Sequence, residues 1–326
     1  MRLFLLLSLA VCALFFGSLV VGPAGLGFGE SISALIIGDG GPLTLVMREI
    51  RLPRALLAVI IGASLGLAGA AMQGYLRNPL AEPGLIGVSG SAAFGAVLAI
   101  HTGFAGAFAL GLPLAALAGA LAGVMLVMVL AGPRGGSLTL ILAGIAVSAL
   151  AAALTSLVLN LSPNPFAANE IVFWMMGSLA DRSMTHVWLA LPFITLGMIV
   201  LSRLSRDLDA LTLGEDAAQA MGIRLNRLRL MLVAGVTCVV GAGTAVAGAI
   251  GFVGLVVPHI LRPMVGARPS RLLWASALGG AAMVLLADIA VRIILPARDL
   301  KLGVLTALVG APLFLHLILK LRRGRL

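Results

Sequence analysis

Long apolar runs separated by short polar segments dominate this chain. Residues 55–76 and 135–169, for example, contain no Asp, Glu, Lys or Arg. A helix needs about 20 mainly apolar residues to cross the hydrocarbon core of a bilayer. The pattern therefore predicts ten membrane-spanning helices, at 3–22, 54–75, 85–101, 106–131, 138–160, 186–203, 229–248, 252–266, 271–294 and 303–321.

Two stretches of the pattern stand apart from the others. The predicted span at 252–266 is the weakest of the ten, because it is short and contains Pro258 and Pro263, and proline interrupts helical hydrogen bonding. The stretch 165–180 has 16 residues, fewer than the roughly 20 that a spanning helix needs. We expect it to form an additional short helix that does not span.

Composition indicates that the bilayer is the solvent of this chain. Hydrophobic residues make up 61% of the sequence and charged residues 10%, with a mean hydropathy of +1.15. Soluble domains carry roughly 25% charged residues. The predicted fold class is all-α: a polytopic membrane protein with a single transmembrane domain over residues 1–326.

The basic residues predict the orientation of the chain. The formal net charge is +10, from 22 Lys and Arg against 12 Asp and Glu. With a cytoplasmic N-terminus, fifteen of these 22 basic residues fall in cytoplasmic segments and the other seven outside. Short cytoplasmic loops are enriched in Lys and Arg. We therefore expect a multi-pass inner-membrane protein with both termini in the cytoplasm, and we interpret the positive charge as a topology signal rather than a nucleic-acid site.

Glycine occurs at spacings that suit helix packing. Gly62 and Gly66 are four residues apart, as are Gly119 and Gly123. Small residues at this spacing allow two helix backbones to approach closely in lipid. The spacing predicts a packed helical bundle, but it does not by itself indicate transport.

The longest charged segment, residues 204–228, is predicted to be cytoplasmic. Within it, Leu213, Ala217, Ala220 and Met221 recur at helical spacing. Gly222 suits the end of such a helix. A short amphipathic helix between spans either lies on the lipid surface or docks on a partner protein, and the spacing leaves both interpretations open.

A phosphate-binding loop for ATP is missing from the sequence. The only two lysines, Lys301 and Lys320, do not follow a glycine, so the G-x4-G-K-[ST] pattern cannot form. The four histidines are far apart and have no metal-ligand spacing. We therefore expect a chain that is not an enzyme and that has no metal site and no cofactor of its own.

A few polar residues lie inside or beside the predicted spans. Asp288 and Arg292 are four residues apart, so they can pair along one helix face. An ionisable residue at membrane depth is a candidate functional residue, and a structural pair that holds the helix to its neighbours is the alternative. We interpret His259 as a packing residue, and we expect Gln73 and Asn78 to bond to loop backbone.

Seven segments of the chain carry a more specific signal. They are IRLPRALLAVIIGASLGLAGAAMQG (50–74), NPLAEPGLIGVSG (78–90), FWMMGSL (173–179), LGEDAAQAMGI (213–223), AGAIGFVGLVVPHILR (247–262), LADIAVR (286–292) and GVLTALVGAPLFL (303–315). In this order they resemble the FecCD family of ABC importer permeases, which serve iron-siderophores, haem and vitamin B12. Each segment is weakly specific, whereas the ordered set is very specific.

The resemblance implies an architecture and a set of partners. Similar proteins have ten transmembrane helices, form a homodimer with the translocation path on its two-fold axis, bind two separate ABC ATPase subunits that hold the ATP, and receive substrate from a periplasmic binding protein. The segment 204–228 contains the match to the coupling helix that sits in a groove of the ATPase. Its matching residues are Leu213, Gly214, Ala217, Ala218, Met221 and Gly222.

The resemblance also implies two further groups of site residues. Arginines on the periplasmic face of similar proteins receive acidic residues of the binding protein, and the matching positions are Arg51, Arg54 and Arg292. Similar proteins narrow the path on the cytoplasmic side with an Asn-Pro-Leu loop and the start of the fifth helix. The matching positions there are Asn78, Leu80, Ser137 and Leu138.

One segment departs from the family pattern. Where similar proteins have Glu-Leu-Pro-Val/Ile-Gly before the last helix, this chain has Asp299, Leu300, Lys301, Leu302 and Gly303. The departure puts the local loop geometry in doubt and leaves the fold unaffected.

The substrate is predicted at the level of the family. We expect an iron chelate, either a siderophore or haem, because most similar proteins handle iron, and the alternative within the family is vitamin B12 (cobalamin). The alternative from another class is a secondary transporter driven by an ion gradient, which would carry acidic residues in the middle of several spans. Only Asp288 lies well within a span, and this argues against that class.

Overall fold

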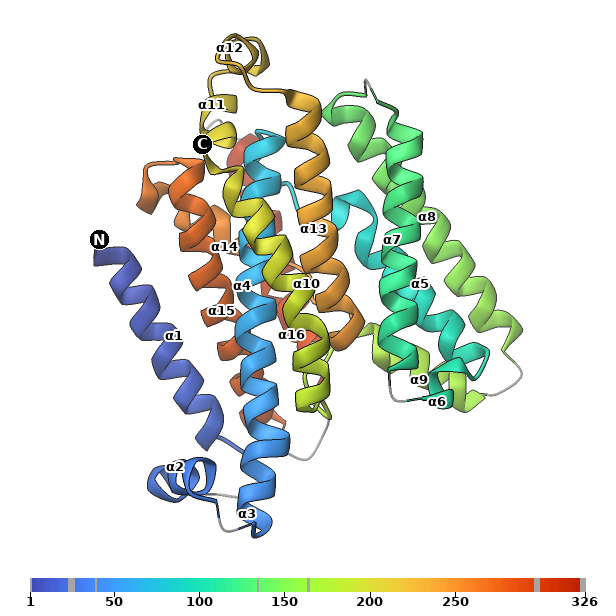
Figure 1. Ribbon diagram of the computed structural model, residues 1–326, viewed down its shortest axis with the longest axis vertical. Helices are drawn as coiled ribbons and strands as arrows, with labels where there is room; N and C mark the ends of the chain where they lie inside the picture. Colours follow the sequence, from blue (N-terminus) through green and yellow to red (C-terminus); the bar gives the residue numbers. More distant parts are fainter. Residues whose placement is uncertain are drawn as a thin grey trace.

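The chain folds as a bundle of roughly parallel and antiparallel helices (Figure 1). The structure is a computed structural model, and it describes residues 2–22, 27–38, 40–108, 110–133, 135–162, 165–295 and 300–322. Its helices are α1 (Arg2–Val20), α2 (Phe28–Ile36), α3 (Pro42–Leu45), η1 (Val46–Arg51), α4 (Leu52–Tyr75), η2 (Pro83–Ile86), α5 (Val88–His101), α6 (Phe104–Ala107), α7 (Gly111–Ala131), α8 (Ser137–Leu161), α9 (Pro165–Met175), α10 (Met184–Arg203), α11 (Ser205–Leu211), α12 (Glu215–Ala220), α13 (Leu225–Ala247), α14 (Val253–Leu261), η3 (Pro263–Val265), α15 (Pro269–Ile294) and α16 (Leu302–Arg322).

Each of the ten predicted spans coincides with a helix. In the described part of the chain, eight helical segments are long and apolar enough to cross a bilayer. Helices α5 and α14 are shorter, with 14 and 9 residues. At 1.5 Å per residue they extend about 21 Å and about 14 Å, less than the roughly 30 Å of the hydrocarbon core. Ten crossings therefore remain a prediction, in which irregular segments would complete these two.

The predicted short helix after the fifth span is confirmed as α9, which has 11 residues. The cytoplasmic segment predicted at 204–228 folds as α11 and α12, with the first turn of α13 at its end. The predicted departure at residues 299–303 lies partly outside the described residues, since Asp299 is not among them.

Close helix contacts at glycine hold the centre of the bundle together. Helix α4 is largely buried, and it packs most extensively against α15. A β-carbon on Gly62 would collide with the backbone of Gly280, and one on Gly66 would collide with the next turn of α15. Gly119 and Gly123 of α7 meet α5 in the same way. Both glycine pairs predicted from spacing therefore lie at helix–helix contacts, as membrane packing requires.

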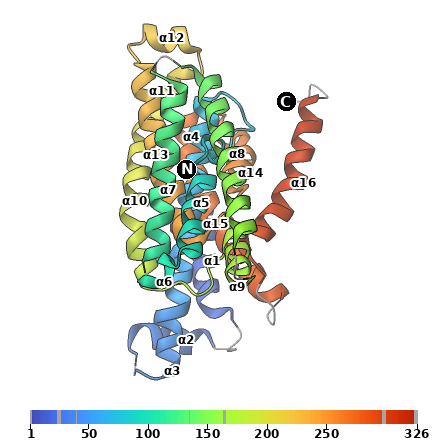
Figure 2. The same cartoon turned by 90° about the vertical axis from the view of Figure 1, so that its right-hand side faces the viewer.

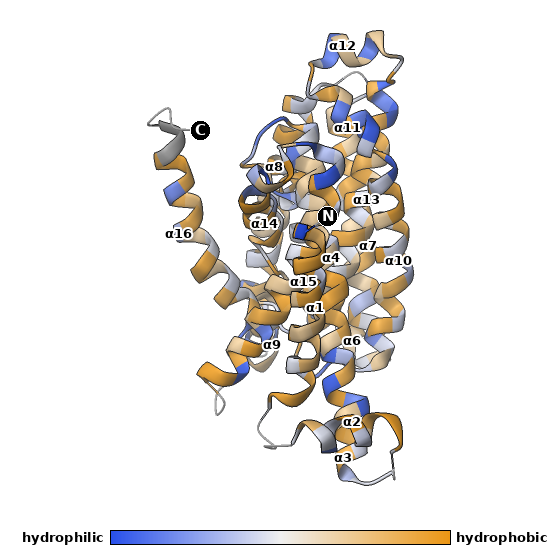
Figure 3. Cartoon of the chain, turned by 90° about the vertical axis from the view of Figure 1, so that its left-hand side faces the viewer, coloured by the Kyte–Doolittle hydropathy of each residue, from blue (hydrophilic) through white to orange (hydrophobic). Residues whose placement is uncertain are grey.

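The two ends of the bundle differ in character. Helices α11 and α12 project at one end, and α2 and α3 lie at the other (Figure 1). Helix α1 begins and α16 ends toward the α12 end (Figures 1 and 2). Apolar residues cover the long helices, and hydrophilic residues gather toward the ends (Figure 3). Helix α16 leans away from the other helices (Figure 2), so most of its surface is not covered by its own chain.

Candidate functional site

The projecting helix α12 is held by a small apolar base. Leu208 and Leu211 of α11 are buried beneath it, and Ala218 of α12 is 0% exposed. Glycines stand at both ends of α12: Gly214 before it has φ +108° and Gly222 after it has φ +87°. Only glycine adopts these conformations readily. The sequence therefore allows a tight, well-defined helix of six residues.

Two large apolar side chains flank α12 and are exposed, beside the exposed polar residues Glu215, Asp216 and Gln219 of the helix itself. Leu213 is 69% exposed and Met221 is 63% exposed, which is unusual for large apolar side chains at a polar end of a membrane protein. The coupling role of the six matched residues remains a prediction, and one of the six lies on the inner side of the helix. Ala218 is buried against its own chain, so it supports α12 and cannot contact another protein directly.

A carboxylate ties α11 to the start of α15. Asp209 accepts hydrogen bonds from Ser270 N at 2.8 Å and from Arg268 Nε at 3.1 Å. Partial burial opposes ionisation of Asp209, but the hydrogen bonds from Ser270 and Arg268 outweigh it and lower the pKa of this carboxyl below its usual value. The base of the projecting segment is thereby fixed to a long membrane helix.

At the opposite end, the three arginines predicted to dock a binding protein all have partners inside the chain. Arg51 is 5% exposed, and its Nη1 donates to the carbonyl oxygens of Leu19 at 2.8 Å and Val20 at 2.9 Å. These are free carbonyls at the C-terminal end of α1, where a cation is favourable. The expectation of an open cluster on the outer rim is therefore corrected for Arg51, whose side chain is buried.

Arg54 and Arg292 converge on Asp288, which is 0% exposed. Arg54 Nε lies 2.8 Å from Asp288 Oδ1, and Arg292 Nη2 lies 2.8 Å from Oδ2. Arg292 Nη1 also donates to the carbonyl oxygens of Ser18 and Val21, both at 2.8 Å. The predicted pairing of Asp288 with Arg292 is confirmed, and a third helix joins it through Arg54.

The two predicted parts of the cytoplasmic gate lie on neighbouring elements. Asn78 Oδ1 accepts a hydrogen bond from Leu80 N at 2.9 Å, which shapes the turn after α4. Ser137 and Leu138 begin α8, and Leu138 is 68% exposed. The loop between α4 and α5 packs along α8, where the carbonyl of Leu85 meets Gly144. The narrowing role of these residues remains a prediction.

The expectation that the Gln73 side chain bonds to loop backbone is wrong. Gln73 Nε2 donates to the carbonyl oxygen of Leu255 in α14 at 3.1 Å, and its Oε1 accepts from Arg262 Nη2 at 2.8 Å. Gln73 therefore joins α4 to another helix rather than to its own loop, while Asn78 bonds to loop backbone as expected. His259 has a partner within the chain.

Glu82 is a site residue that the sequence analysis missed. Its Oε1 accepts a hydrogen bond from Phe252 N at 2.9 Å, across 170 positions of sequence. Burial raises the pKa of Glu82, although the Phe252 N–H opposes the shift. A lone acid in the apolar run 78–90 was the available signal. The sequence pattern did not indicate that Glu82 contacts the distant segment at Phe252.

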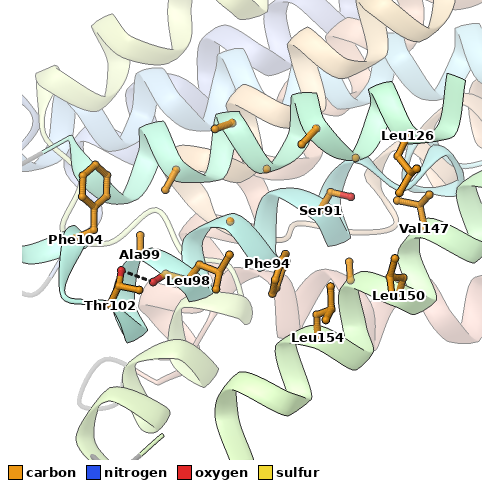
Figure 4. Close-up of a pocket in the computed structure, with 17 residues that line it drawn as sticks. Ser91, Phe94, Leu98, Ala99, Thr102, Phe104, Leu126, Val147, Leu150 and Leu154 are labelled. Carbon is orange, nitrogen blue, oxygen red and sulfur yellow. Dashed lines mark hydrogen bonds between the residues drawn. The ribbon is translucent and has the colours of Figure 1, made fainter. Parts of the chain in front are cut away.

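Two apolar cavities open between the helices. One, of about 530 Å³, lies between α5, α7 and α8, and Phe94, Leu98, Leu126, Val147 and Leu154 are among its lining residues (Figure 4). The other, of about 690 Å³, lies between the end of α9, the segment just before α14 and helix α16, which leans away from the bundle. Neither is built like an enzyme site. In the described residues there is no group of three or more His, Cys, Asp or Glu that could hold a metal ion.

The geometry defines a helical bundle of the kind that crosses a membrane, and a fold of this kind does not by itself specify a function. The model of the FecCD transport family matches residues 9–320. The chain therefore belongs to the FecCD transport family, and it is an ABC transporter permease that does not hydrolyse ATP itself. ATP is handled by a partner ATPase, which excludes the ion-driven secondary transporter.

Relatives cover most of the chain. An uncharacterized ABC transporter permease protein, YvrB of Bacillus subtilis (strain 168), is 39% identical over 91% of this chain and 84% of its own length. The Fe(3+) dicitrate transport system permease protein FecD of Escherichia coli (strain K12) is 39% identical over 85% of this chain and 86% of its own. The vitamin B12 import system permease protein BtuC of Escherichia coli O9:H4 (strain HS) is 41% identical over 84% of both chains.

The fold is also that of a solved transporter. A chain in an inward-facing conformation of an ABC transporter assigned to the metal-chelate type superposes with a TM-score of 0.86 at 34% identity. The match covers 98% of this chain and 99% of the other. The predicted fold class, all-α and polytopic, is confirmed.

Removal of the buried carboxylate tests the arginine cluster. Asp288→Ala leaves Arg54 and Arg292 without a counter-charge, and we expect a loss of about 3–5 kcal/mol of stability, since breaking a buried ion pair from one side strands the other charge. Arg268→Ala, at the exposed pair with Asp209, is the control and should cost at most about 1 kcal/mol. Thermal unfolding of the purified protein in detergent measures both. Equal midpoints for Asp288→Ala and the unchanged protein would refute the structural role.

Proposed function

We propose that this chain is the permease of an importer that carries an iron chelate, a siderophore or haem, from the periplasmic side into the cytoplasm. Support comes from the family and from the relative FecD, which belongs to a ferric dicitrate system. Vitamin B12 is the second candidate, because the permeases BtuC are related at an equal level, 41% identity. In either case the cargo is a bulky metal chelate.

The observation that carries the proposal is the pair of large apolar side chains that flank α12. Leu213 before the helix and Met221 after it are exposed, and the buried Ala218 anchors the helix between them. Exposed large apolar side chains on a rigid base are typical anchors for a partner groove. We assign this groove to the ABC ATPase. Each of two permease copies would dock one ATPase subunit.

The proposed assembly is a homodimer. Helix α16 leans outward (Figure 2), and it carries an exposed apolar face that includes Leu308, Val309, Leu315 and Leu319. In a dimer, the second copy would cover part of this face, and the cavity beside α16 would border the path between the two subunits. A path with an apolar lining holds no chelate tightly, so selection would fall to the periplasmic binding protein.

Docking of that binding protein at the outer end would involve arginines that already bond to Asp288. Arg54 and Arg292 retain some exposure, with side chains 17% and 9% accessible. An acidic lobe that engaged them would compete with Asp288. Such docking would act mainly on the orientation and association rate of the binding protein. The arginines would bond to Asp288 in the free permease and to an acidic residue of the binding protein in the complex.

The first test addresses energy coupling. Leu213→Asp combined with Met221→Asp should reduce binding of the ATPase at least tenfold, which corresponds to about 1.4 kcal/mol, and abolish ATP-driven uptake. Both side chains are exposed, so the permease itself should still fold. Co-purification of the ATPase with the permease and uptake into proteoliposomes are the measurements.

Two further variants frame this test. Leu213→Met with Met221→Leu keeps the apolar face and should keep coupling. Ala218→Glu would bury a charge within the chain's own core, so it should lower stability and is unsuited to test docking. Normal ATPase binding by the double Asp variant would mean that α12 is not the docking helix.

The second test addresses orientation. We propose that the α12 end and both termini are cytoplasmic, because the basic residues favour that side. Single cysteines at Gly41 and Asn226, in a chain with Cys12 and Cys238 replaced by serine, should differ in their labelling. Gly41→Cys should react with a membrane-impermeant thiol reagent in intact cells, and Asn226→Cys only after permeabilisation. Labelling of both from the same side would contradict the scheme.

The third test addresses the substrate. The complex of permease, ATPase and binding protein is reconstituted in proteoliposomes and supplied with a ferric siderophore, haem or cobalamin, each radiolabelled at its metal. ATP-dependent accumulation of iron supports the main proposal, and accumulation of cobalt alone supports the second candidate. Accumulation of none of them, by a complex that hydrolyses ATP, would reject the chelate class.

A further inference from the structure

We propose that Glu82 is a positioning residue for transport, which links the loop between α4 and α5 to the wall of the cavity beside α16. The inference rests on the proposed import function and adds a residue to it. Glu82 follows the predicted gate residues Asn78 and Leu80 in the same loop. It is the acidic member of an otherwise uncharged segment, residues 78–90.

The loop is fitted tightly against α14. Glu82 Oε1 accepts the hydrogen bond from Phe252 N, the residue before the first turn of α14, at 2.9 Å. Next to this bond, a β-carbon on Gly254 would lie 2.7 Å from Pro83 Cδ. The loop and α14 are therefore joined by one polar bond and one close apolar contact.

Phe252 is held in a conformation that its side chain disfavours. Its backbone has φ +68° and ψ −19°, the left-handed region that glycine adopts readily and a bulky residue rarely does. Such a conformation persists when the surroundings hold it in place, and it is frequent at sites that switch. Here the Glu82 carboxylate holds the backbone N–H of Phe252.

The side chain of Phe252 contacts helix α16. A β-carbon on Gly310 of α16 would collide with the Cβ and ring atoms of Phe252. The ring therefore packs directly on the backbone of α16. Phe252 also lines the cavity of about 690 Å³, together with Met175, Met176 and residues of α16 such as Ala307 and Leu308.

These contacts form a continuous series of interactions from the loop to the cavity wall. Glu82 does not line the cavity; it acts through Phe252. When the loop at Asn78 and Leu80 moves, the bond to Glu82 must either break or carry the backbone of Phe252 with it. Because the ring occupies the space at Gly310, a shift of Phe252 displaces α16. Opening on the cytoplasmic side is thereby linked to the shape of the cavity.

Variants of Glu82 test this in the reconstituted complex. Glu82→Ala removes the acceptor, and we expect uptake per ATP hydrolysed to fall about tenfold, the size of effect typical for loss of a charge-assisted hydrogen bond. Glu82→Gln keeps a neutral acceptor at the same reach and should recover most of the coupling. Glu49→Ala removes an exposed carboxylate elsewhere and should match the unchanged complex. Wild-type coupling in Glu82→Ala would overturn the proposal.

A second variant and a second readout guard against simple misfolding. Phe252→Gly removes the ring but suits the left-handed backbone, so it should fold and lose coupling as Glu82→Ala does. The readout is the rate at which Leu308→Cys, in the serine-substituted background, reacts with a thiol reagent with and without ATP and vanadate. When Glu82 and Phe252 are both present, we expect ATP and vanadate to change the labelling rate of Leu308→Cys at least threefold. We expect no such change in the Glu82→Ala or Phe252→Gly variant.

The labelling readout separates this inference from the proposed function. It needs ATP but no chelate, so a complex that imports none of the tested chelates still reports on the link. The proposal fails if Leu308→Cys responds to nucleotide equally in all variants. It also fails if Glu82→Gln loses the response as completely as Glu82→Ala while Phe252→Gly retains it.

Discussion

The carboxylate of Asp288 is fully buried in α15, and the guanidinium groups of Arg54 and Arg292 both bond to it. Burial of a lone charge away from water is very costly, so each of these groups requires the others. The same arginine side chains, with Arg51, also satisfy carbonyls at the end of α1. Helices α1, α4 and α15 are thus joined, at the end of the bundle where α2 and α3 lie, by a set of bonds in which each member depends on the rest.

At the other end of the bundle, a buried arginine likewise bonds to carbonyl groups at the end of a helix. Arg229, 3% exposed, donates to the carbonyl oxygens of Gly132, Pro133 and Gly135 just after α7. Backbone groups at helix ends must find partners inside the protein where water is scarce. Between the Asp288 cluster and Arg229, the helices pack closely through glycine. Outside this packed centre, α12 projects at one end of the bundle and α16 leans away from the other helices.

This division suits a permease whose energy comes from another chain. The core formed by α4, α13 and α15 connects the α12 end of the bundle to the end at which α2 and α3 lie. Helix α11, which precedes α12, is tied to this core because Asp209 bonds to the start of α15. Glu82 and Phe252 then offer a route from the core to α16 and the cavity beside it. Each contact in this route joins segments more than 50 positions apart in sequence.

Hydrophobic periodicity and charge bias by themselves determined the class of fold, the positions of the helices and the glycines at helix contacts. They could do so because a bilayer imposes its requirements locally: each span must be apolar over its own length, and each close contact needs a small residue. The ordered motifs likewise identified the family, and the amphipathic spacing located α12.

Tertiary structure alone decided which polar groups meet. Arg51 looked like an outer docking residue, but the end of α1 covers it, and Ala218 looked like a partner contact, but α11 lies beneath it. Gln73 and Glu82 found partners in α14 and at its start. A pattern along the chain reports the environment of each residue averaged over a helix face. Pairing between distant segments depends on how helices cross and rotate, and that information exists only when all of them are packed together.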